Sequence, residues 1–153
     1  MSRLLVVVAV ALAVLAVVLR SREQHPPAVL ADPVRTPGVL NPDVTQATIK
    51  LTICVPGWTR TVRPPVEYTN ALKVRQMRAY AETGSRSDYQ EDHLISLELG
   101  GNPTDPRNLW PEPYPRAAQV DQIENDLNAR VCSGALTLAE AQLLESTLKH
   151  RHG

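Results

Sequence analysis

An acidic residue and a histidine stand next to each other in the middle of this 153-residue chain, at Asp92 and His93. An imidazole that is held in place can take a proton from water near neutral pH. A carboxylate is a hard oxygen ligand that suits a divalent cation such as Mg²⁺. Asn108 follows His93 by 15 residues (108 − 93), after the chain reversal that Gly100 and Gly101 permit, and could hold the imidazole by a hydrogen bond. These residues predict a general base beside a metal ligand.

Two strands and a helix are expected to position these side chains. The apolar run from Asp92 to Leu99 indicates the first strand, and the second strand begins near Asn108. Side chains alternate between the faces of a strand, so Asp92 and His93 face opposite sides unless a twist or bulge intervenes. A helix is expected over residues 116–131, with a buried stripe of Val120, Ile123, Leu127 and Val131. Three polar residues line one edge of that stripe: Asp121, Glu124 and Asn128.

The motif resembles the HNH nucleases of the ββα-metal (His-Me finger) superfamily. The resemblance rests on Asp92-His93, the run from Leu94 to Leu97, the paired glycines and Asn108-Leu109. It implies that Asp92 binds the metal, His93 is the general base and Asn108 positions His93. It also implies a small α+β domain with a ββα-metal core, and an endonuclease that hydrolyses phosphodiester bonds with one divalent metal ion. Mg²⁺ is the first choice for this ion, and Mn²⁺, Ni²⁺ and Zn²⁺ are alternatives.

The family also places a metal ligand on the helix after the second strand. The helix expected over residues 116–131 contains no histidine. Asp121 follows Asn108 by 13 residues (121 − 108), a spacing that the family uses for a ligand, so Asp121 is the predicted second ligand. Glu124 and Asn128 remain alternatives.

The N-terminal part of the chain predicts export. Arg3 precedes an unbroken apolar run from Leu4 to Leu19, which is typical of a signal peptide or an N-terminal membrane anchor. The body of the protein is then expected outside the cytoplasm, either anchored to the membrane or secreted. The predicted organisation is a signal or anchor over residues 1–22, a Pro-rich linker over 23–40, the HNH-like domain over 41–149 and a tail over 150–153. Because the C-terminal histidines fall in this tail, His93 is expected to be the single histidine inside the domain.

The chain has two cysteines, Cys54 and Cys132. In an exported chain such a pair predicts one disulfide that closes most of the domain, the alternative being two buried free thiols. The segment 45–53 is rich in β-branched residues and predicts a strand, although it could also begin a helical turn. Further helices are expected over 69–81 and 137–149, the latter opened by the capping box Thr137–Glu140.

The net charge of zero hides a division between a basic and an acidic segment. Acidic residues dominate from Asp88 to Asp126, whereas basic residues dominate from Arg60 to Arg86. Arginines neutralise backbone phosphates, and this pattern predicts a nucleic acid as the partner. DNA is placed before RNA, although the sequence does not decide between them, and no nucleotide cofactor is expected. The candidate phosphate-binding residues are Arg60, Arg63, Arg75 and Arg78, although a solvated helix face is the alternative for the last two.

Other classes of function fit the same residues. The chain could be a catalytically silent nucleic-acid-binding protein, or a structural envelope protein that retains the ββα scaffold. It could also hydrolyse a different phosphodiester. Trp58 and Trp110 are expected to belong to the core rather than to stack on bases, because the chain has no phenylalanine.

Overall fold

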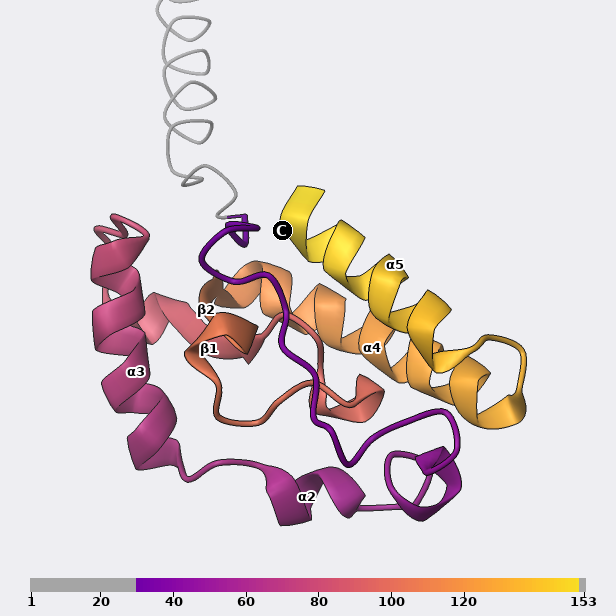
Figure 1. The fold of residues 1–153 in the computed structure, drawn as a ribbon. Helices are drawn as coiled ribbons and strands as arrows, with labels where there is room; N and C mark the ends of the chain where they lie inside the picture. Colours follow the sequence, from indigo (N-terminus) through magenta and orange to yellow (C-terminus); the bar gives the residue numbers. More distant parts are fainter. Residues whose placement is uncertain (1–29, 152–153) are drawn as a thin grey trace, which may run out of the picture.

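The computed structural model describes residues 30–151 and has a mixed α+β fold (Figure 1). An antiparallel two-stranded sheet pairs β1 (Tyr89–His93) with β2 (Leu109–Pro113). In Figure 1 this hairpin lies between α3 on one side and α4 on the other, and α5 packs along α4. The α-helices are α2 (Trp58–Val62), α3 (Val66–Ala79), α4 (Tyr114–Ser133) and α5 (Leu138–Arg151).

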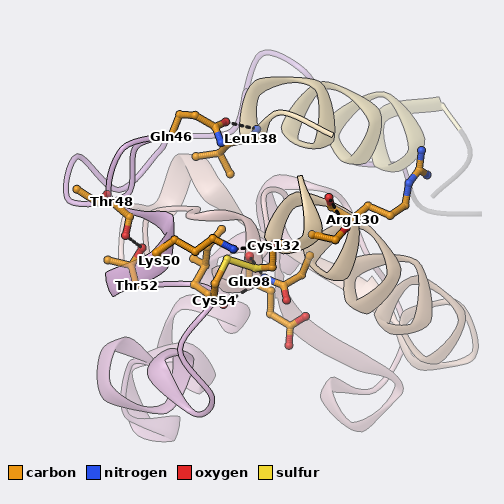
Figure 2. The surroundings of a disulfide bond; sticks show 12 residues. Gln46, Thr48, Lys50, Thr52, Cys54, Glu98, Arg130, Cys132 and Leu138 are labelled. Atoms are coloured by element: carbon orange, nitrogen blue, oxygen red, sulfur yellow. Dashed lines mark hydrogen bonds between the residues drawn. A yellow bond between two sulfur atoms is a disulfide. The ribbon is translucent and has the colours of Figure 1, made fainter. Parts of the chain in front are cut away.

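The predicted disulfide between Cys54 and Cys132 is present, with the two Cα atoms 5.6 Å apart (Figure 2). It ties the segment before α2 to the last turn of α4. The ammonium of Lys50 donates to the carbonyl of Cys132 beside it. The bond therefore closes a loop that contains both strands and most of the helical packing.

The first strand is shorter than the sequence predicted. It was expected over residues 92–99, but it begins at Tyr89 and ends at His93. The backbone of Ile95 is instead bound by a side chain: its N–H donates to Asn108 Oδ1 at 3.0 Å, and its carbonyl accepts from Asn108 Nδ2 at 3.0 Å. Because both polar groups of Ile95 have these partners, the chain turns here rather than continuing the ladder with β2.

The strand predicted over residues 45–53 is wrong. This segment forms turns and a short 3₁₀-helix, Ile49–Leu51, so the alternative of a helical turn was closer. The Thr48 hydroxyl donates to the carbonyl of Asp43 at 2.8 Å and accepts from the N–H of Thr45 at 2.8 Å. Such local bonds from threonine side chains to the backbone favour turns over a strand.

The helix predictions hold with shifted ends. The capping box of α5 is confirmed, since Glu140 Oε2 accepts from the Thr137 N–H at 2.8 Å and Thr137 Oγ1 accepts from the Glu140 N–H at 3.2 Å. The buried stripe of α4 is confirmed at three of its four positions: Val120, Leu127 and Val131. Ile123 is 37 % exposed, so its prediction was wrong.

The packed part of the chain begins earlier than the predicted boundary at residue 41. Ala31 is buried, and its N–H donates to the carbonyl of Lys149 at 3.2 Å. Ala31 forms a small apolar cluster with Leu94 and Trp110, which is fully buried as expected for a core tryptophan. Trp58 packs, partly buried, against the larger apolar cluster, which includes Ile53, Leu99 and Val131. The predicted signal or anchor lies outside the described residues, and among residues 30–151 no helix is long and apolar enough to cross a membrane.

Candidate functional site

A polar cavity of about 340 Å³ lies beside β1 and brings together four of the predicted site residues: Arg63, Asp92, His93 and Asp121. A neighbouring hollow of about 220 Å³ shares part of its lining, including Arg63, Asp92 and His93. The strands pair in regular register, and β1 has a partner on one side only among the described residues. Gln90, Asp92 and His93 all line the cavity, although Asp92 and His93 alternate along the strand and the pairing contains no bulge. The cavity is lined by Arg63, Gln90, Asp92, His93, Ser96, Leu97, Glu98, Asp121, Glu124 and Asn125.

His93 is 5 % exposed and is held by the chain that follows β1. Its Nε2 lies 3.1 Å from the carbonyl of Pro103. A carbonyl can only accept, so Nε2 carries the proton and Nδ1 is left as the acceptor nitrogen. Burial lowers the pKa of His93, and this effect exceeds the opposing effects of Asp92 and the Pro103 carbonyl. A neutral imidazole with one free acceptor nitrogen can take a proton from water.

Asn108 does not bind the imidazole, which corrects the prediction for this residue. Its side chain is fully buried, and its Nδ2 donates to the carbonyls of Ile95 and Asn102, both at 3.0 Å. The backbone carbonyl of Asn108 accepts from the N–H of Leu94 at 2.8 Å. Asn108 therefore clamps the loop that follows His93, and it positions the histidine only through the backbone.

Asp92 is buried and is bound through both oxygens. Oδ2 accepts from the ammonium of Lys149 at 2.8 Å, and Oδ1 accepts from Gln90 Nε2 at 3.1 Å. Burial alone would raise the pKa of Asp92, but the Lys149 charge and hydrogen bond, with His93 and Gln90, hold it below its usual range. Asp92 is therefore an ionised carboxylate next to the histidine.

The three candidates for a second ligand on α4 are placed differently. Asp121 is exposed and lines the cavity, and its pKa is raised by burial and by the charge of Asp92. Glu124 lies deeper, with its side chain 12 % exposed, and burial raises its pKa to about 7. Asn128 is absent from the lining, and its Nδ2 donates to the carbonyls of Ile53 and Glu98. Within residues 30–151, no group of three or more His, Cys, Asp or Glu side chains is gathered to hold a metal ion.

Lys149 is the site residue that the sequence reasoning missed. Its side chain is fully buried, and its ammonium donates to Asp92, to Glu124 at 2.7 Å and to the His93 carbonyl. Glu145 Oε1 lies 3.5 Å from the same nitrogen. Hydrophobicity does not mark the face of α5 that carries Lys149, because Leu143 and Leu144 are exposed while the buried positions are Leu138, Ala141, Glu145 and Lys149.

A further carboxyl group, that of Glu112, is buried within this region. Glu112 lies on β2 and is fully buried, and no donor among the described residues is bonded to its oxygens. Burial, then the charge of Asp92, raises its pKa to about 9. Glu112 is therefore a neutral acid near pH 7.

The four predicted phosphate-binding arginines are separated in the structure. Arg63, just after α2, is exposed and lines the cavity, and its positive charge contributes to the lowered pKa of His93. Within residues 30–151 it forms no ion pair within 4.0 Å. Arg60 lies beside Gly57, whereas Arg75 and Arg78 are exposed on α3 and do not line the cavity. Arg63 alone of the four is brought to His93.

A second histidine belongs to the folded part, which corrects the expectation that residues 150–153 form an exposed tail. α5 continues to Arg151, and His150 is half-buried with its Nε2 2.9 Å from the carbonyl of Thr36. His150 does not line the cavity.

No family model, curated protein or solved structure matches this chain. The interpretation of the cavity therefore depends on the residues that line it.

Proposed function

We propose that the protein is a metal-dependent endonuclease with an HNH-like ββα core of β1, β2 and α4. The observation that carries the proposal is the single cavity shared by His93, Asp92, Asp121 and Arg63. A neutral base, hard oxygen ligands and an exposed guanidinium are the parts that phosphodiester hydrolysis requires. They come from three separate segments of the chain.

His93 is the general base of the proposed reaction. Nδ1 takes the proton of the attacking water, because Nε2 is committed to the Pro103 carbonyl. The lowered pKa of His93, caused chiefly by burial, keeps the imidazole neutral and able to accept. Asn108 fixes the loop that carries Pro103 and Asn102, so the imidazole is oriented before substrate arrives.

The cavity suits a hard divalent cation by its donor chemistry. Mg²⁺ is typically held by one or two carboxylates together with substrate phosphates, which does not require a preformed cluster of three ligands. Asp92 and Asp121 would hold the ion, and Glu124 is the alternative to Asp121. When bound, the ion stabilises negative charge on the scissile phosphate and the leaving oxygen. Asp92 remains ionised for this role because Lys149 opposes the effect of burial.

Arg63 is the proposed phosphate contact. It is exposed and it lines both hollows beside His93. A nucleic acid is the substrate that offers repeated phosphates to such a residue, and DNA is the nucleic acid that we propose to test first. The disulfide is compatible with an extracellular location, and we propose that the protein acts outside the cytoplasm.

The experiment is a plasmid-nicking assay on the full-length chain with its disulfide formed. Supercoiled DNA is incubated with Mg²⁺ or Mn²⁺, and EDTA serves as the metal-free control. Replacing His93 with Ala is expected to lower the rate by about 100-fold or more, the usual contribution of a general base. His150→Ala is the matched control, because this histidine lies outside the cavity, and it should cleave like the wild type.

Retained nicking by His93→Ala would remove His93 from the mechanism. No nicking in any metal, from a folded protein, would favour the second candidate, a catalytically silent nucleic-acid-binding protein. That candidate is supported by Lys149, whose ammonium is already paired with Asp92 and Glu124. It predicts DNA binding in a gel-shift assay that is independent of metal, whereas a structural envelope protein would neither bind nor cleave.

A further inference from the structure

The ammonium of Lys149 lies in a pocket made of oxygen atoms. Asp92 Oδ2, Glu124 Oε1 and the His93 carbonyl accept its three hydrogen bonds, and Glu145 Oε1 is 3.5 Å away. These groups come from β1, α4 and α5. Carboxylate and carbonyl oxygens are also the ligands that hard divalent cations prefer. The ammonium thus occupies a position whose surroundings have the chemistry of a cation site.

The carboxyl groups around this position outnumber the positive charge. One ammonium faces Asp92, Glu124 and Glu145, and Glu112 adds a fully buried carboxyl with no bonded donor among the described residues. An unpaired buried carboxyl is costly in the interior of a protein. Glu112 is neutral near pH 7, so it adds to the region a buried carboxyl without a bonded partner rather than a further negative charge, and this observation is separate from the ion pairs of Lys149.

We propose that Lys149 is a built-in cation of the site. Its ammonium fills an inner cation position, fixes Asp92 and Glu124, and leaves a soluble divalent cation only the outer position on the cavity side of these carboxylates. Lys149 is a positioning residue in this scheme, because it is fully buried and cannot touch substrate. The inference deepens the proposed endonuclease function and rests on it for the role of the outer cation.

An ordinary structural ion pair makes a different prediction. If Lys149 only stabilised the fold, its replacement would destabilise the protein and leave the response to metal unchanged. If the ammonium fills a cation position, its removal opens that position to a divalent ion, whose binding to the folded state also raises stability. Metal binding therefore separates the two roles.

The test measures Mn²⁺ binding to the full-length chain by electron paramagnetic resonance, together with thermal unfolding with and without Mn²⁺. Lys149→Met keeps an unbranched side chain and removes the charge. Its affinity for Mn²⁺ is expected to exceed that of the wild type by about tenfold or more, and Mn²⁺ should restore much of the lost thermal stability. Lys149→Met combined with Glu124→Gln should lose this gain, because one oxygen ligand is replaced by an amide.

Lys73→Met is the matched control. Lys73 is also a buried lysine, and its ammonium donates to the Tyr89 carbonyl of β1 at 2.8 Å without a carboxylate within 4.0 Å among the described residues. It should lose stability and gain no Mn²⁺ affinity. If Lys149→Met does not fold alone, the proposal requires that Mn²⁺ restore its folding.

Equal Mn²⁺ affinity in the wild type and Lys149→Met, or an unfolded variant that Mn²⁺ does not restore, would overturn the proposal. Binding is read without cleavage. A failure of the endonuclease proposal therefore leaves this test intact, and the reverse also holds.

Discussion

Removing the disulfide should cost the domain a large part of its stability. Cys54 and Cys132 are separated by 78 residues. In the chain-entropy model, releasing a cross-link of that loop length destabilises the folded state by about 4.5 kcal/mol at 25 °C. A small domain is typically stable by only about 5–15 kcal/mol, so the loss would bring it close to unfolding.

The position of the bond makes its effect reach the candidate site. Figure 2 shows Glu98, a residue of the cavity lining, beside the disulfide. On the same helix as Cys132, Asn128 Nδ2 donates to the carbonyls of Ile53 and Glu98, at 3.3 Å and 2.8 Å. These two bonds depend on the same approach of α4 to the segment before α2. The end of the cavity near Glu98 should therefore loosen first.

The assay is urea unfolding of the oxidised protein, of the same protein in reductant, and of the double variant Cys54→Ala/Cys132→Ala. Reduction breaks the cross-link without removing side-chain carbon or sulfur atoms, so it isolates the effect of loop closure on the free energy of unfolding. The reduced protein and the double variant should both lose about 4–5 kcal/mol, and reductant should not affect the double variant. A loss below about 1 kcal/mol in the reduced protein would refute the reasoning, because the unfolded chain would then gain little freedom.

Two further predictions concern the buried loop and helix beside β1. Burial raises the pKa of Glu145 to about 8 from 4.5, so between these values the folded state binds a proton that the unfolded state releases. The free energy of unfolding should therefore fall as pH rises from about 4.5 to 8, by at most about 1.4 kcal/mol per pH unit. Thermal unfolding across this range checks the slope, and Glu145→Gln, which keeps an acceptor for the Ser96 N–H, should flatten it; an equal slope in the variant would contradict the assignment. A Cβ on Gly101 would lie 1.8 Å from the Ile95 carbonyl oxygen, so Gly101→Ala should unfold the domain. Gly134 has φ +83° and no atom within 4 Å of an added Cβ, so Gly134→Ala should cost only about 1–2 kcal/mol of unfolding free energy. Similar losses for both variants in chemical denaturation would show that the loop around Gly101 can move.

The hairpin, the helices and the disulfide could be predicted because their signals are local in the sequence or few in number. Two cysteines allow a single intramolecular pairing, and the Thr137–Glu140 capping box marks the start of α5. The strand over 45–53 failed because β-branched content does not supply a partner strand. Threonine hydroxyls bind the backbone there and favour turns.

The spacing of Asn108 from His93 predicted their neighbourhood but not their contact. The side-chain amide of Asn108 has both donors and an acceptor, and a peptide group offers it an acceptor and a donor in return. The imidazole of His93 offers less, because its Nε2–H is already bonded to the Pro103 carbonyl. The backbone of Ile95 accepts and donates to Asn108, and so takes up the amide. Which of two nearby partners an amide binds depends on loop geometry within about an ångström, and sequence spacing does not set positions to that precision.

Burial divides the positive charges of the site into two roles. Lys149 is fully buried and already has three acceptors, so its charge can hold Asp92 and Glu124 but cannot reach a phosphate. Arg63 is exposed, and its guanidinium can be given to a ligand without leaving a buried charge unpaired. In the proposed function, a phosphate would therefore approach from the Arg63 side of the cavity, where Arg63 and His93 line both hollows. α5, which lies outside the β1, β2 and α4 unit, thus supplies the buried positive charge of the site, and the proposed contact with substrate phosphate is left to Arg63.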